Sequence, residues 1–164
     1  MILKSWPYAA TLALLAGCSS QTPQERRSDD ARDVAMVERM SRAPLIPVTP
    51  SAISRDDIAR YGLDRPGCIF TKAPGEGPLF IATRDDGFMR LGSEIKRFAA
   101  KQTGAGLPGG ARTTYVGLSS SVDFARQPSD GTADDQADWP ARMIVHDAQD
   151  RVAFMADGRM RCSA

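Results

Sequence analysis

Short apolar segments that alternate with tight-turn sequences constrain the fold of this chain more than any other feature. Apolar runs rich in β-branched and aromatic residues are typical of strands, and the polar turn residues between them are typical of hairpins. The predicted strands are 68–71, 79–83, 88–91, 94–99, 113–118, 122–125, 142–146, 151–156 and 159–162. The sequence therefore predicts a mainly β or α+β domain, with a small antiparallel sheet that closes into a barrel or sandwich.

Turn sequences mark where the predicted strands reverse direction. Gly and Asp are favoured in tight loops because they tolerate a left-handed backbone. The predicted turns are Asp85-Asp86-Gly87, Gly92-Ser93, residues 147–150 and Asp157-Gly158. Val152 and Phe154 then share one strand face, and Met160 and Cys162 share one face of the next strand. We expect both faces to point into the core.

One short N-terminal helix is predicted at the start of this domain. Ser54, followed three residues later by Asp57, has the pattern of a capping box. The helix is expected to end at Tyr61, because Gly62 suits a left-handed C-terminal cap. We expect the folded domain to begin near Ser51.

The segment that precedes the domain is predicted to be a tether. Asp29 or Asp30 is expected to cap a helix that runs to about Ser41. Proline then recurs at every third position, at residues 44, 47 and 50, which suits a polyproline II segment.

Two roles are open for this proline-containing segment. One is a ligand for an aromatic groove of another protein. The other is a spacer that lies along the domain, which is favoured because Leu45, Ile46 and Val48 are available to pack onto it.

The first residues have the three parts of a secretory signal. Lys4 is positively charged, residues 6–15 are mostly apolar, and the motif Leu15-Ala16-Gly17-Cys18 supplies small residues before a cysteine. The apolar run is too short for a membrane-spanning helix, which needs ~20 apolar residues. This motif resembles the cleavage and lipidation site of bacterial lipoprotein precursors. The alternative is an ordinary secretory signal that contains a cysteine.

The resemblance implies a diacylglyceryl group on the Cys18 thiol, cleavage before Cys18 and acylation of the new amine. It implies a signal peptide at residues 1–17. Together with the tether and strand patterns above, this predicts a lipidated tether at 18–50 and one β-rich domain at 51–164. Several acyl chains together give firm membrane anchoring. Ser19 stands where enteric lipoproteins retained in the inner membrane have Asp. We therefore expect a lipid-anchored protein of the cell envelope, in the outer membrane and facing the periplasm if the source is Gram-negative.

Cys68 and Cys162 are the two cysteines left if Cys18 carries lipid. Export places them in an oxidising compartment, where disulfides persist. We expect them to form a disulfide that joins the first and last predicted strands of the domain. Free buried thiols and metal ligation are the alternatives, although two cysteines and the distant His146 lack any zinc-site spacing.

Two other motifs are weak signals for a ligand. Residues 104–109 match G-x-G-x-x-G, but a dinucleotide fingerprint follows a strand and opens a helix, whereas residues 113–116 favour a strand. Asp130, Asp134 and Asp135, with Asp138, lack the spacing of an EF-hand. We therefore expect a solvated acidic loop, with no cofactor and no metal site.

His146 is the only histidine in the chain. A serine nucleophile usually needs an imidazole as its base. Ser119, Ser120 and Ser121 are the candidate nucleophiles that His146 could serve. The chain has no nucleophile-elbow motif. We expect His146 to lie at a strand end before a turn, and we expect no catalytic residue.

Charge and motifs leave three classes of function. The chain has 21 Lys and Arg against 20 Asp and Glu, so it has no basic field that would hold nucleic acid. The favoured class is a non-catalytic envelope lipoprotein that acts as a binding or structural module, held at the membrane by its lipid, with an envelope protein as a possible partner. The second class is a lipid-anchored hydrolase inhibitor, because the layout is similar to that of the membrane-anchored lysozyme inhibitors, which are small lipidated β-barrels with a disulfide. An envelope enzyme is the third and least supported class.

Overall fold

The computed structural model describes residues 22–128 and 137–163. The chain forms two compact units, Met1–Pro44 and Leu45–Ala164. Cys18 and the acidic residues Asp130, Asp134 and Asp135 lie outside the described residues. No helix in the described part of the chain combines the length and the apolar character needed to cross a membrane.

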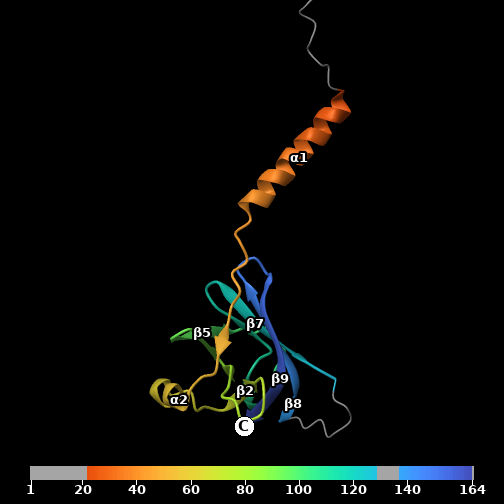
Figure 1. Cartoon of the computed structure of the whole chain (residues 1–164). Helices are drawn as coiled ribbons and strands as arrows, with labels where there is room; N and C mark the ends of the chain where they lie inside the picture. The colour runs from red at the N-terminus through yellow and green to blue at the C-terminus, as the bar shows by residue number, and fades with distance from the viewer. Residues whose placement is uncertain (1–21, 129–136, 164) are drawn as a thin grey trace, which may run out of the picture. The chain divides into compact units, whose positions relative to one another are not determined.

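The described part of the first unit is dominated by α1 (Pro23–Ser41), the helix drawn in orange in Figure 1. The predicted start at Asp29 or Asp30 is wrong, because Thr22 caps the helix instead. The Thr22 hydroxyl accepts a hydrogen bond from the Glu25 backbone N–H, and the Glu25 carboxylate accepts one from the Thr22 N–H at 2.7 Å. This is a capping box between Thr22 and Glu25, with Pro23 at the first helical position, and the two features together are typical of a helix N-terminus. No residue of α1 is buried.

The second unit is mostly β and forms a closed antiparallel barrel, so the predicted fold class is confirmed. Its strands are β1 (Pro50–Ser51), β2 (Gly67–Thr71), β3 (Phe80–Thr83), β4 (Asp86–Leu91), β5 (Glu94–Ala100), β6 (Thr114–Val116), β7 (Ser120–Arg126), β8 (Asp138–Asp147) and β9 (Val152–Ser163). The order β4-β3-β2-β9-β8-β7-β6-β5 closes through pairing of β4 with β5, which makes eight strands, and β1 adds to β4.

Aromatic side chains fill the interior of the barrel. Phe80 is fully buried, and its ring centroid lies 5.2 Å from those of Tyr115 and Phe124 and 5.8 Å from that of Phe98. Met89, Met143 and Met160, with Phe70 and Val145, occupy the remaining space. A barrel of eight strands has an interior just wide enough for side chains. The inner faces of the strands therefore form the core.

A second, smaller core lies on the outside of the barrel under α2 (Arg55–Tyr61), which is labelled in Figure 1. The predicted Ser54–Asp57 capping box and the left-handed cap at Gly62 are both confirmed. Ile58 of α2 packs with Ile81 and Phe88, which point outward from β3 and β4. The outer face of this side of the barrel is thereby covered.

Two Asp-Gly pairs that suggest turns have a different role in the structure. The first reversal falls at Arg84 and Asp85, so Gly87 lies inside β4. The predicted turn at Asp157-Gly158 is wrong, because β9 continues through it as one strand. A Cβ on Gly87 would lie 2.2 Å from Phe80 Cζ, and one on Gly158 would lie 2.2 Å from the Thr71 carbonyl oxygen and 2.8 Å from Phe70 Cζ. Both glycines therefore leave room for core rings.

The prediction of which β9 side chains point into the core is confirmed for three residues and wrong for one. Met160 and Cys162 are buried, and Phe154 packs against the main core. Val152 is exposed instead, because the register between β8 and β9 shifts at His146. Such a bulge inserts an extra residue and turns the neighbouring side chains to the opposite face.

The predicted disulfide joins Cys68 of β2 to Cys162 of β9, and these two residues face each other in the ladder. It closes a chain separation of 94 residues. The short helix η1 (Pro108–Gly110) lies against the same strand ends. Gly109 has a left-handed φ of 68°, and a Cβ there would lie 2.4 Å from the Ser163 carbonyl oxygen. The long β5–β6 loop thus packs over the end of the barrel that holds the disulfide.

Candidate functional site

The hydroxyl of Tyr115 is a polar group buried in the barrel, and its role is structural. The buried Tyr115 hydroxyl donates to the Thr83 carbonyl oxygen at 2.7 Å and accepts from the Arg112 backbone N–H at 2.9 Å. Burial raises the pKa of Tyr115 to about 12. The hydroxyl therefore stays protonated well above pH 7 and continues to donate to Thr83, which ties β6 to β3 across the barrel end.

The outer surface has a face that differs from the side covered by α2. We call the outward side of β6, β7, β8 and β9 near the β6–β7 and β8–β9 turns the open face. Its residues form two rows that cross the four strands in register, and they are Val116, Ser121, His146 and Val152 in the first row and Thr114, Asp123, Ile144 and Met155 in the second.

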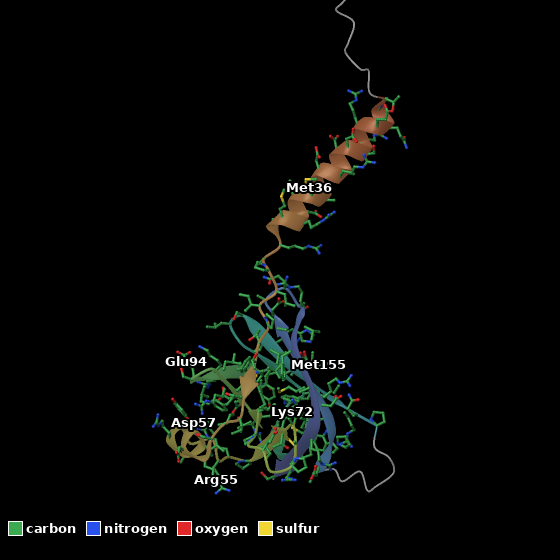
Figure 2. All side chains as sticks on the ribbon, viewed as in Figure 1. Met36, Arg55, Asp57, Lys72, Glu94 and Met155 are labelled. Atoms are coloured by element: carbon green, nitrogen blue, oxygen red, sulfur yellow. A yellow bond between two sulfur atoms is a disulfide. The ribbon has the colours of Figure 1, made fainter. Side chains whose placement is uncertain are left out.

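Apolar side chains on the open face are exposed to solvent. Val116, Val152 and Met155 retain 44%, 50% and 54% of their accessible surface, and Met155 is labelled on the barrel in Figure 2. Val152 and Met155 lie next to each other on β9, whereas Ser121 and His146 separate Val116 from them. Single exposed apolar residues are common on proteins, but adjoining ones mark interaction sites.

A small polar cluster lies at the centre of the open face. The Thr114 hydroxyl donates to Asp123 Oδ1 at 2.6 Å, and His146 Nε2 lies 3.6 Å from Asp123 Oδ2. His146 Nδ1 is buried and has no hydrogen-bond partner among the described residues. One imidazole nitrogen therefore faces a carboxylate and the other is shielded from solvent.

His146 lies near the end of β8, before the turn at 148–151, as predicted. Among the three serines considered as nucleophiles, Ser121 is the one that faces His146 in the ladder. Ser119 lies in the β6–β7 turn, and Ser120 pairs with Asp147. Sequence reasoning did not foresee that Ser121, Asp123 and His146 share one face, because that depends on the register of β7 with β8.

Ion pairs occupy the outer surface of β8 and β9 next to the open face. Arg142 Nε and Nη2 contact the two carboxylate oxygens of Asp157 at 2.6 and 2.8 Å, which lowers the pKa of Asp157. Asp138 accepts from Arg159 at 2.8 Å and from Arg161 at 3.4 Å. The charges of these residues are paired within the chain, whereas Val152 and Met155 beside them are apolar and exposed.

The weak motifs of the sequence lie in the loop before β6 and at the start of β8. Residues 104–109 belong to the loop before β6, and Gly106 forms a bridge with Arg112. Asp138 is held by two arginines. Within residues 22–128 and 137–163, no three His, Cys, Asp or Glu side chains gather as metal ligands would. Comparison of the chain with protein families, with curated proteins and with solved structures found no match.

Proposed function

We propose that this protein is a non-catalytic binding module of the bacterial cell envelope, anchored to a membrane by a lipid on Cys18. The observation that carries the proposal is the open face. The interior is occupied by core side chains and the opposite outer face is covered by α2, so a partner has to bind outside the barrel. The exposed Val116, Val152 and Met155 supply an apolar contact area there.

The surroundings of the two His146 imidazole nitrogens favour a binding role for this protein rather than a catalytic one. A general base needs a nitrogen within hydrogen-bond reach of the proton that it removes. Nε2 of His146 is directed at Asp123, and Nδ1 is buried. We propose that the Thr114–Asp123–His146 cluster is a structural part of the open face and that the exposed apolar side chains make the contact with the partner.

A second candidate function is inhibition of a hydrolase such as lysozyme. A closed barrel with one disulfide, on a chain with a lipidation motif, is the layout that this class of inhibitor shares. Fold likeness alone is a weak argument for function. An assay of lysozyme inhibition by the purified protein separates this candidate from a general binding module.

Substitution on the open face tests the proposal. We expect chemical cross-linking in the native envelope to trap a partner protein, and Met155→Asp to weaken its binding to the purified protein at least tenfold, a loss of about 1.4 kcal/mol. A buried carboxylate in an apolar contact has no compensating partner. Binding is measured by calorimetry or surface plasmon resonance.

Tyr61→Asp is the matched control, because Tyr61 of α2 is exposed to 50% and Met155 to 54%. The control should bind as the wild type does, within twofold, and His146→Ala should not abolish binding. Equal losses for Met155→Asp and Tyr61→Asp, or the absence of any trapped partner, would contradict the proposal.

A further inference from the structure

Leu118 is the most exposed large apolar side chain of the described chain, with a relative exposure of 109%. It lies in the turn between β6 and β7, two residues after Val116. Turn positions are usually taken by Gly, Pro, Asn, Asp or Ser, each for a conformational reason. Leu has no such advantage, and no described side chain covers it. Local folding therefore gives no reason for a leucine at this position.

The turn presents Leu118 on a fixed support. The Gly117 N–H donates to the Ser120 carbonyl oxygen at 2.7 Å, which closes the hairpin. A Cβ on Gly117 would lie 3.0 Å from the Phe98 ring, so the turn sits directly on the core. A contact residue held in place before binding loses less conformational entropy when the complex forms.

The charges near Leu118 favour a protein partner over a lipid surface. The β8–β9 turn lies beside the β6–β7 turn, because Ser120 pairs with Asp147. Arg151 neutralises Asp147 at 2.7 Å, whereas the Asp150 carboxylate has no ion pair in the described part of the chain. Residues 116–121 contain no Lys or Arg. Binding to anionic bilayers depends on basic residues next to the apolar ones, whereas the one charge in these two turns without an ion pair among the described residues is the Asp150 carboxylate.

We propose that Leu118 is the anchor of a protein–protein contact and that it inserts into an apolar pocket whose rim is basic. This inference rests on the proposed binding function and names the residue and the kind of partner. Few residues carry most of the affinity at an interface, and they sit in desolvated pockets. Asp150 then contributes through attraction to the basic rim, mainly by speeding association.

Site-specific photo-cross-linking in cells tests the kind of partner. The photoreactive residue p-benzoylphenylalanine is placed at position 118 in the full-length protein, and at position 61 as the control. We expect position 118 to yield an adduct with a different protein, and position 61 to yield none. A product of two copies of this chain, a lipid adduct alone, or no adduct from position 118 overturns the inference.

The affinity of the purified pair tests the anchor itself. We expect Leu118→Ser to weaken binding at least 30-fold and Asp150→Lys to slow association at low salt. Ile46→Ser, at another exposed apolar position, should change affinity less than threefold. A loss below threefold for Leu118→Ser overturns the inference. If Met155→Asp still weakens binding in that case, the proposed function stands while the anchor fails; if neither variant has an effect, both fail.

Discussion

Replacing Phe80 with alanine should lower the free energy of unfolding by about 3–5 kcal/mol, the usual cost of removing a buried phenylalanine. Phe80 is fully buried and contacts three other rings, those of Phe98, Tyr115 and Phe124. Truncation leaves a cavity lined by rings on three different strands. A closed barrel cannot collapse onto it easily, because its diameter is set by strand number and stagger.

Urea unfolding, followed by the fluorescence of the buried Trp139, measures this loss. Phe80→Leu keeps most of the apolar volume and is the matched variant, with an expected cost below that of alanine. A natural domain has a total stability of about 5–15 kcal/mol, so the alanine variant should unfold at much lower urea concentration. A loss below about 1 kcal/mol would contradict the central place of Phe80 in the core.

Removing the disulfide should cost about 2–5 kcal/mol, as for other native disulfides of small exported domains. The bridge closes a chain separation of 94 residues, and long loops lose the most entropy in the unfolded state. The double variant Cys68→Ala, Cys162→Ala tests this loss by urea unfolding against the oxidised wild type. We expect the midpoint to fall strongly.

The disulfide should also resist reduction while the barrel is folded. Cys68 and Cys162 are both buried, and η1 packs against the same end of β2. Thiol labelling after treatment with dithiothreitol should be slow without denaturant and fast in urea. Rapid labelling of the folded protein, or a double variant as stable as the wild type, would contradict a shielded structural bridge.

The sequence predicted most of the local structure of the barrel. Alternating apolar residues and hairpin turns identified the strands, and Ser54 with Asp57 identified α2. Asp157-Gly158 was misread as a turn, because the sequence does not distinguish a glycine needed for a turn from one needed for close contact with the Thr71 backbone and the Phe70 ring. The bulge at His146 could not be predicted either, since it depends on how β8 pairs with β9.

The open face could not be predicted from the sequence. Val116, His146 and Met155 come from three strands, and only the register places them on one outer face. Alternation shows that a residue points away from its strand's core face, but it does not show whether a helix covers that side. The covering of Ile81 and Phe88 by α2, against the exposure of Val152 and Met155, required the three-dimensional fold.

We propose above all that this protein is a binding barrel held at a membrane by a lipid on Cys18. Detergent-phase partitioning of the protein from cells tests the anchor, with Cys18→Ala as the variant and the mass of the mature N-terminus as a second readout. We predict that the wild type enters the detergent phase with a mature chain that begins at a lipid-modified Cys18, and that the variant stays in the aqueous phase. A wild type that keeps residues 1–17, or a variant that partitions as the wild type does, would contradict the account.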